Sequence, residues 1–494
     1  MPLPLAPPRR AAHSRILSSV LALALLLGSC STTFDNAPLN RPARATQLAW
    51  NSGPGRHAAE GGETAIALSL SGGGLRASAF ALGVLQELAD EPGDVFDDIR
   101  FVSSVSGGSL TAAYLGLQGR AGLDSLREHV LLRNFEMNLR LSLWSPENVL
   151  RLLAGGLNDR SNLGQVLDRD VFHGATFGDL TQRHGPEVWI NATDLYNRTP
   201  FPFVPQVFRA LCSDLAGLRV SEAVAASMAV PLAFAPVVLK TYPEDCKDPL
   251  PPWAAQAAQD RGGVTAGLLT SVARAVQNYR NPERMRFVKL ADGGLTDNQG
   301  LSSILVARAA AGTPHDPLSE RAAVQLRRLL FLVVDAGRPP SGDWALQAEG
   351  PAGMDVGLAA ADAAVDSATR MSVQAFRTEM QRWQEQVLRF RCELPPERVH
   401  ALLPPGREWD CRDLRFEVEV LSFDSLPDGL AERLRRMPTR LSLSQAEVDA
   451  AIEGGRLAAH TSAALARYRQ AALRQTPAAT GVATGVDRSS SAAR

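Results

Sequence analysis

The stretch from Leu68 to Leu88, LSLSGGGLRASAFALGVLQEL, places three consecutive glycines between two different apolar patterns. The residues before the glycines, AIALSLS, form a short apolar run that suits a buried strand, and those after them keep apolar residues at helical spacing. Gly72, Gly73 and Gly74 are therefore predicted to form a strand-to-helix turn. Such a turn leaves free N–H groups at a helix N-terminus, and the missing Cβ atoms let another group approach the backbone closely. The turn could hold a nucleotide phosphate or a reaction oxyanion, or it could be only a tight packing joint.

A second turn of this kind occurs in FVSSVSGGSL, where an apolar strand is followed by Ser106, Gly107 and Gly108. The pattern is typical of a nucleophile elbow, GxSxG, which needs small neighbours because its serine lies on a sharp, strained turn. Ser104 stands where the motif has its first glycine, and serine is small enough for the turn. Ser106 is the candidate nucleophile, and the alternative is an ordinary turn of serine and glycine.

A third piece is FVKLADGGLTDNQG, in which an apolar strand ends at Asp292 and is followed by Gly293 and Gly294. A carboxylate at the carboxyl end of a strand lies where open α/β sheets place their sites. Taken alone, the pattern could also be a simple Asp-Gly turn. Three such pieces in order, each at the end of a strand, together predict a catalytic site.

Strand-like and helical segments alternate from residue 64 onward, which predicts an α/β fold: a three-layer sandwich with a mostly parallel central sheet flanked by helices. We expect one domain over residues 63–474. Residues 120–180 are largely helical and form either a cap over a site or an ordinary buried layer. Helices are also expected within 350–390 and 442–474, with RFEVEVLSF between them as a strand. The other predicted strands are AIALSLS, IRFVSSVS, EVWINATDL, RFVKLADGG and LLFLVVDAG.

The amino-acid composition is that of an ordinary globular protein. The 494 residues are 45% hydrophobic and 21% charged, which is enough apolar material for a large core. The formal net charge is -1, and no long basic run with interleaved aromatic residues occurs. These features argue against nucleic acid as a partner.

The N-terminus has the features of a secretion signal. Arg9, Arg10 and Arg15 precede ILSSVLALALLLGS, an apolar run that is short for a membrane span, and LGSC then resembles the bacterial lipobox. Residues 1–29 are predicted to be a lipoprotein signal peptide, with Cys30 as the lipidated mature N-terminus; a membrane anchor or an ordinary signal peptide is the alternative. Ser31, in place of an aspartate, favours the outer membrane of the bacterial cell envelope. Residues 30–62 are expected to be a flexible tether and 475–494 a disordered tail.

Four cysteines remain once Cys30 is set aside: Cys212, Cys246, Cys392 and Cys411. An even number in an oxidising compartment makes two disulfides plausible. Three pairings are possible, and we favour Cys212 with Cys246 and Cys392 with Cys411 because proline-rich, loop-like sequence lies between the members of each pair. No CxxC or HExxH spacing occurs, so a metal site is not expected.

Together these motifs resemble the patatin-like phospholipases. The resemblance rests on GGGLR at Gly72, SVSGG around Ser106, AVAASMAVPLAFAPV at 223–237 and DGG at Asp292, and it extends to MPTRLSLSQAEVDAAIEGGRLA at 437–458. It implies a lipid acyl hydrolase in which Asp292 accepts the proton of Ser106 and an acyl-enzyme forms on the serine. It also implies an oxyanion hole from Gly72, Gly73 and Gly74 with the positive charge of Arg76 beside it. A phospholipid or another acyl-ester lipid would be the substrate, and no metal or other cofactor is required.

Other readings of the motifs remain open. An α/β hydrolase with a Ser/Asp/His triad would order its residues serine, acid, histidine, and His315, His400 and His460 all follow Asp292. A non-catalytic envelope lipoprotein could use the same fold, because fold alone does not imply function. A nucleotide-binding role for the triple-glycine turn is disfavoured because GGGLR lacks both the GK[ST] ending and the GxGxxG spacing.

Replacing Cys30 with alanine removes the predicted lipid acceptor. We expect Cys30→Ala to leave the protein released from the membrane fraction or retained as an uncleaved precursor, because the rest of the chain has no other apolar stretch of membrane length. Cell fractionation followed by intact-mass measurement tests this. Unchanged membrane fractionation together with normal signal cleavage would contradict it.

Overall fold

The computed structural model describes residues 36–44, 62–90, 94–138, 163–182, 185–231, 233–246, 248–257, 264–337, 343–346, 348, 350–351 and 354–475. The strands in this part of the chain form one sheet in the order β5-β6-β3-β2-β1-β7-β8, and β4 pairs with β3 beside this path. The strands are β1 Thr64–Leu70, β2 Ile99–Val105, β3 Glu187–Asp194, β4 Thr199–Pro202, β5 Val237–Lys240, β6 Phe287–Ala291, β7 Arg328–Asp335 and β8 Arg415–Ser422. The predicted signal peptide and the predicted C-terminal tail lie outside the described residues, apart from Gln475.

The predicted mostly parallel sheet is confirmed. Strands β3, β2, β1, β7 and β8 run parallel to one another, whereas β3 with β4, β3 with β6 and β5 with β6 form antiparallel pairs. The sequence did not indicate β4 or β5, which are four residues each. The β4 sequence, TPFP, contains two prolines, and proline is confined to sheet edges and strand ends because it donates no ladder hydrogen bond.

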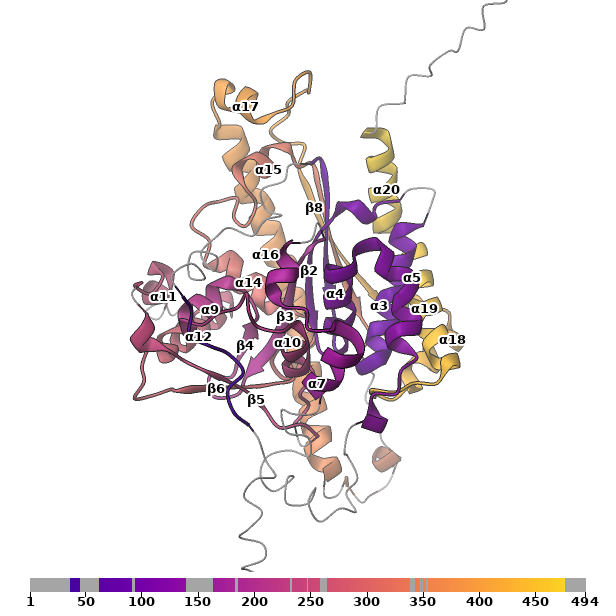
Figure 1. Ribbon diagram of the computed structural model, residues 1–494. Coiled ribbons are helices and arrows are strands. Elements are labelled where there is room, and N and C mark those ends of the chain that lie inside the picture. Colours follow the sequence, from indigo (N-terminus) through magenta and orange to yellow (C-terminus); the bar gives the residue numbers. More distant parts are fainter. Residues whose placement is uncertain are drawn as a thin grey trace, which may run out of the picture.

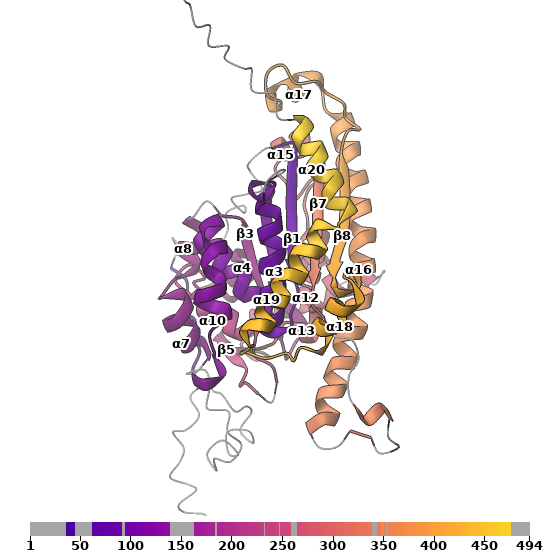
Figure 2. The same ribbon diagram turned by 90° about the vertical axis from the view of Figure 1, so that its right-hand side faces the viewer.

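Helices cover both faces of the sheet. Along β1, Ile66 and Leu68 belong to one hydrophobic core, and Ala65 and Ala67 belong to another, as the alternation of a strand requires. Helices α3 (Gly74–Ala89), α4 (Gly107–Gln118) and α19 (Gln445–His460) line the first core, and α14 (Ser302–Ala309) and α16 (Met354–Glu393) line the second. Figure 2 shows α16 on one side of β7 and β8, with α3 and α19 on the other. The fold is therefore the expected three-layer sandwich.

The remaining helical elements lie around this framework. Residues 120–180, predicted to be helical, contain α5 Gly122–Leu126, the π-helical turns η4 Arg127–Leu131 and η6 Asp168–Phe172, the turn η5 Glu136–Asn138, α7 Leu163–Leu167 and α8 Phe177–Gln182. The centre of that span, 139–162, lies outside the described residues. The other helices are α9 Pro205–Leu211, α10 Val220–Ser227, α11 Pro252–Ala257, α12 Val264–Tyr279, α13 Gly294–Asp297, α15 Glu320–Gln325, α17 Pro396–Leu402, α18 Asp428–Arg436 and α20 Ala463–Gln475; short 3-10 turns are η2 Phe96–Asp98, η3 Gly119–Ala121, η7 Pro243–Asp245, η8 Asp343–Leu346 and η9 Phe423–Ser425.

Part of the expected tether is packed against the domain. Residues 36–44 run beside the edge strand β5, near its label in Figure 1. The side chain of Asn40 donates to the Ser213 hydroxyl at 2.7 Å and accepts from the Lys240 N–H at 2.7 Å, and the Leu39 N–H donates to the Val238 carbonyl at 3.0 Å. The expectation of a free tether over 30–62 is therefore wrong for residues 36–44. Hydrogen bonds to a sheet edge hold this polar, aperiodic segment, and composition alone did not indicate them.

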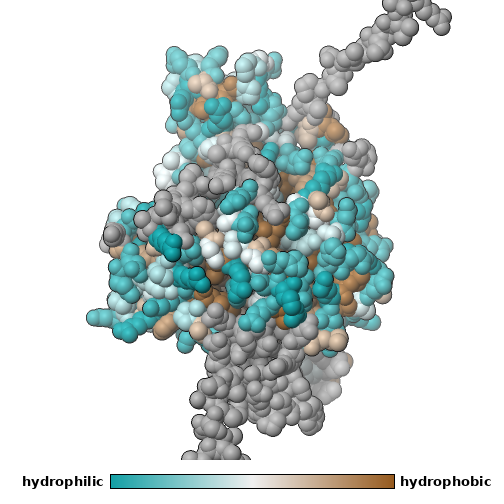
Figure 3. All heavy atoms as spheres, viewed as in Figure 1, coloured by the Kyte–Doolittle hydropathy of each residue, from teal (hydrophilic) through white to brown (hydrophobic). Residues whose placement is uncertain are grey.

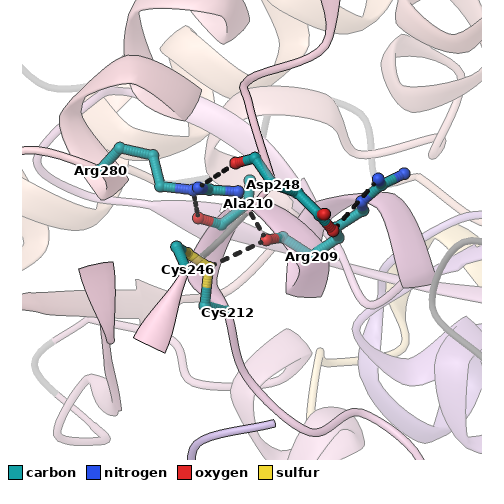
Figure 4. The surroundings of a disulfide bond; sticks show 6 residues. All are labelled: Arg209, Ala210, Cys212, Cys246, Asp248 and Arg280. Atoms are coloured by element: carbon teal, nitrogen blue, oxygen red, sulfur yellow. Dashed lines mark hydrogen bonds and ion pairs between the residues drawn. A yellow bond between two sulfur atoms is a disulfide. The ribbon is translucent and has the colours of Figure 1, made fainter. Parts of the chain in front are cut away.

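Both favoured cysteine pairs are joined in the structure. Cys212 is bonded to Cys246 with their Cα atoms 5.5 Å apart, and Cys392 to Cys411 with theirs 5.0 Å apart. Figure 4 shows that Arg280 braces the first bridge by donating to the carbonyl of Ala210 at 2.8 Å. The bonded cysteines are separated by 34 and 19 residues in the sequence. Each bond tethers an irregular segment to a helix.

The described surface is mixed in polarity. Figure 3 shows mostly hydrophilic residues on the visible face, with smaller hydrophobic spots between them. Among the described residues, none of the helices combines the length and apolar character that a membrane span requires.

Candidate active site

Ser106 lies on a strained turn between β2 and α4. Its backbone has φ 50° and ψ -122°, in the left-handed half of backbone space that residues other than glycine rarely adopt. The N–H of Ser106 donates to the hydroxyl of Ser227 at 2.7 Å, and Ser227 in turn donates to the carbonyl of Asn191 at 2.6 Å. This is the geometry of a nucleophile elbow, in which the hydroxyl projects at the start of a helix.

Asp292 accepts a hydrogen bond from this serine. The distance from Ser106 Oγ to Asp292 Oδ2 is 2.8 Å, and the other carboxylate oxygen accepts from the Gly294 N–H at 2.8 Å. Asp292 follows β6, which is antiparallel to β3 and pairs with it only at Thr193 and Asp194. The aspartate thus reaches the carboxyl ends of β2 and β3 from an antiparallel strand, a direction that the apolar run before it does not indicate.

Burial makes Asp292 a stronger base than an exposed aspartate. Its side chain is 8% exposed, and desolvation raises its pKa from 3.8 to about 6. The hydrogen bonds from the Gly294 N–H and the Ser106 hydroxyl oppose the rise because they favour the ionised form. An aspartate with its ordinary pKa would be a weak base at neutral pH, so this environment supplies proton affinity that the residue type alone lacks.

The N–H groups of the three turn glycines differ in their hydrogen bonding. Gly73 and Gly74 have φ 141° and 63°, and their N–H groups have no acceptor within the part of the chain that the structure describes. Gly72 differs, since its N–H donates to the carbonyl of Asn298 at 2.9 Å. The expectation that all three glycines donate to an oxyanion is therefore corrected: Gly72 fastens the turn, and Gly73 and Gly74 remain as donors.

Arg76 lies beside this turn and braces it. The guanidinium is 1% exposed, and it donates from Nη2 to the carbonyl of Ala336 at 2.8 Å and from Nη1 to the carbonyl of Met437. Its positive charge lies near Gly73, as the sequence suggested. Its N–H groups connect the turn to the end of β7 and to a distant C-terminal segment, which the local motif could not indicate.

Glycine is required where the two turns meet. A methyl group on Gly107 would collide with the carbonyl oxygen of Gly74, and one on Gly108 would lie 2.5 Å from the carbonyl oxygen of Leu70. The elbow and the glycine turn therefore touch backbone to backbone. Ser104, at the variant position of the motif, is buried in β2 and donates to the Trp189 carbonyl at 2.9 Å, so its hydroxyl has a partner within the sheet.

No histidine in the described residues is hydrogen-bonded to the serine or the aspartate. His315 contacts the carbonyl of Leu318 at 2.8 Å, His400 that of Pro396 at 3.0 Å, and His460 the carboxylate of Glu87 at 3.0 Å. The geometry therefore favours a two-residue site over a triad. The described residues also contain no group of three or more histidine, cysteine, aspartate or glutamate side chains that could hold a metal ion.

Two residues that shape the site were not singled out from the sequence. Ser227 holds the Ser106 N–H, and its carbonyl accepts the Gly293 N–H at 3.1 Å. Asn298 holds Gly72 through its carbonyl, and its side-chain oxygen lies over the same glycine. Both belong to the sequence motifs at 223–237 and after Asp292. Their roles depend on contacts between segments far apart in the chain.

Residues 68–304 match the family model described as patatin-like phospholipase. This part of the chain is similar to the patatin-like phospholipases. The matched range includes both turns, Ser106, the 223–237 segment and Asp292. It does not include 437–458, to which the sequence resemblance extended.

The comparison with solved structures matches chains of a human enzyme. Human GIVD cytosolic phospholipase A2 has 13% sequence identity and a TM-score of 0.40, and the alignment covers 89% of this chain. The same values hold for its complex with methyl gamma-linolenyl fluorophosphonate. The chain spans 66% of the length of these solved chains. None of the curated proteins matches the sequence.

The raised pKa of Asp292 has a cost in stability that can be measured. Below the unfolded-state pKa the carboxyl is neutral in both states; as pH rises through the folded pKa of about 6, burying the ionised form costs roughly 3 kcal/mol. Asp292→Asn lacks this charge. We expect its free energy of unfolding, relative to wild type, to increase by roughly 2 kcal/mol between pH 4 and pH 7. Urea unfolding of both proteins at each pH measures the change, and a difference that is constant with pH would contradict it.

Proposed function

We propose that the protein is a serine lipid acyl hydrolase of the phospholipase or lysophospholipase type, held at a membrane by lipid on Cys30. The observation that carries the proposal is the 2.8 Å hydrogen bond from Ser106 to a buried Asp292, next to a glycine turn with two N–H groups that have no acceptor among the described residues. The family match of residues 68–304 supports ester-linked lipids as the substrate class. A phospholipid or another acyl-ester lipid would bind with its carbonyl between the elbow and the glycine turn.

Acylation would begin with proton transfer from the Ser106 hydroxyl to the Asp292 carboxylate as the serine oxygen attacks the ester carbonyl carbon. The electron pair of the carbonyl bond moves to its oxygen and forms a tetrahedral oxyanion. When this intermediate collapses, the bond to the alcohol oxygen breaks, and Asp292 returns the proton to that leaving oxygen. The product is an acyl-serine ester and a free alcohol or lysolipid.

The oxyanion would be stabilised by the N–H groups of Gly73 and Gly74. Preorganised donors of this kind typically contribute about 2.7 to 4 kcal/mol each to transition-state stabilisation. Helix α4 begins directly after Ser106, so the partial positive charge of its N-terminus adds to the same field. Arg76 keeps the turn in place from the side that faces away from solvent, since its guanidinium is buried.

Deacylation would use the same groups in reverse. A water molecule gives its proton to Asp292 and attacks the acyl carbonyl, and the serine oxygen leaves with that proton. A pKa of about 6 leaves most of the carboxylate ionised at neutral pH and still able to accept a proton in the transition state. The base is therefore matched to its task by burial.

Location at the cell envelope is part of the proposal. The lipobox-like LGSC and Ser31 support lipid attachment at Cys30 and residence in the outer membrane of a bacterial cell. Several acyl chains on one residue give firm anchorage, since each buried CH₂ contributes roughly 0.8 kcal/mol. An anchored hydrolase would meet its lipid substrate in the same membrane.

Substitution of the dyad tests this mechanism. Ser106→Ala and Asp292→Asn should each lower kcat for ester hydrolysis by at least roughly a thousand-fold, and the double variant should be no worse, because residues that act as a unit are non-additive. In wild type, kcat/KM should rise with pH to a plateau with a midpoint near the Asp292 pKa of about 6. Single replacements of His315, His400 and His460 are the controls, with turnover expected within a few fold of wild type. Loss of activity from one histidine with the fold intact would transfer the assignment to a triad hydrolase, and full activity of Ser106→Ala would defeat both.

A further inference from the structure

The C-terminal segment Met437–Leu441 contacts the glycine turn although it lies outside the family match. The Leu75 N–H donates to the carbonyl of Arg440 at 2.9 Å, and a methyl group on Gly74 would lie 2.6 Å from that same oxygen. The backbone of Arg440 is therefore in contact with the glycine turn that bears the oxyanion donors. Arg76 adds a second link because it donates to the carbonyl of Met437.

Arg440 differs from the other arginines of its neighbourhood. Arg433 donates to the Ala446 carbonyl at 2.8 Å, Arg435 pairs with Asp424 and Arg436 pairs with Glu432. Arg440 is exposed, and its guanidinium makes no hydrogen bond or ion pair with the described residues. Glu447 is within electrostatic range, but its carboxylate is held by the N–H and hydroxyl of Ser444 at 2.8 and 2.7 Å.

An apolar side chain accompanies this free cation. The turn η5 is bonded to the same segment, since the Leu441 N–H donates to Glu136 Oε1 at 3.0 Å and the Phe135 N–H donates to the Leu441 carbonyl at 3.3 Å. Met137, which follows Glu136 in η5, is 82% exposed. A cation whose backbone contacts the oxyanion turn, on a segment that is also hydrogen-bonded to η5, suits an amphiphile that carries an anionic group near its acyl ester.

We propose that Arg440 binds the phosphate of a glycerophospholipid substrate and selects it over neutral acyl glycerols. A guanidinium offers several N–H donors in a planar fork that matches two phosphate oxygens. Arg76 does not serve this purpose, because its guanidinium is buried and engaged with backbone carbonyls. The inference rests on the proposed hydrolase function and specifies its substrate class.

The test compares two substrates that share the scissile esters and differ in the phosphate: monomeric dihexanoyl phosphatidylcholine and monomeric dihexanoylglycerol. The measured quantity is the ratio of their kcat/KM values. Arg440→Gln should lower this ratio roughly ten- to a hundred-fold, mainly through KM for the phospholipid, as expected for the loss of charged hydrogen bonds. Arg440→Lys should restore part of it, since a lysine keeps the charge without the fork.

Arg436→Gln is the matched control, because Arg436 is exposed, lies four residues away and pairs with Glu432. Its ratio should equal that of wild type. An unchanged ratio in Arg440→Gln, with both substrates still hydrolysed, would overturn the inference and leave the hydrolase function standing. If wild type hydrolyses neither substrate, the proposed function itself fails and the inference falls with it.

Discussion

The site depends on the backbone contact between two strand-to-helix turns, one after β1 and one after β2. Gly107 meets the carbonyl of Gly74 with no space for a side chain, so Ser106 and the glycine turn are placed by main-chain geometry. Both turns lie at the carboxyl ends of neighbouring parallel strands whose register pairs Leu70 with Ser104. The central sheet and the helices that cover it therefore serve to hold two short turns in contact.

Burial of Asp292 has opposite effects on stability and on chemistry. Burial removes the carboxylate from water, which raises its pKa to about 6 and makes the ionised form unfavourable in the folded state. In the proposed mechanism, the same desolvation gives the aspartate enough proton affinity to act on a serine hydroxyl. A buried carboxylate with one serine partner and one N–H partner is thus a compromise in which some stability is given up for reactivity.

The parts of the fold that the sequence predicts are those with a signal in the local residue pattern. Apolar runs identify β1, β2, β3, β6 and β7, and small residues around Ser106 identify the elbow. Such local patterns do not show contacts between segments far apart in the chain. The antiparallel direction of β6, the hydrogen bond from the Gly72 N–H to the Asn298 carbonyl and the docking of residues 36–44 all depend on contacts of this kind. Arg76 is an example within one motif, since its position follows from GGGLR but its partners, Ala336 and Met437, do not.

The central claim is that Asp292 activates Ser106 for attack beside the glycine turn. The most direct measurement is the rate of covalent labelling by a fluorophosphonate as a function of pH, with the modified peptide identified by mass spectrometry. The account predicts a single adduct on Ser106, a labelling rate that rises through one ionisation near pH 6, and labelling of Asp292→Asn slowed by orders of magnitude. Equally fast labelling of Asp292→Asn, or an adduct on another residue, would contradict it.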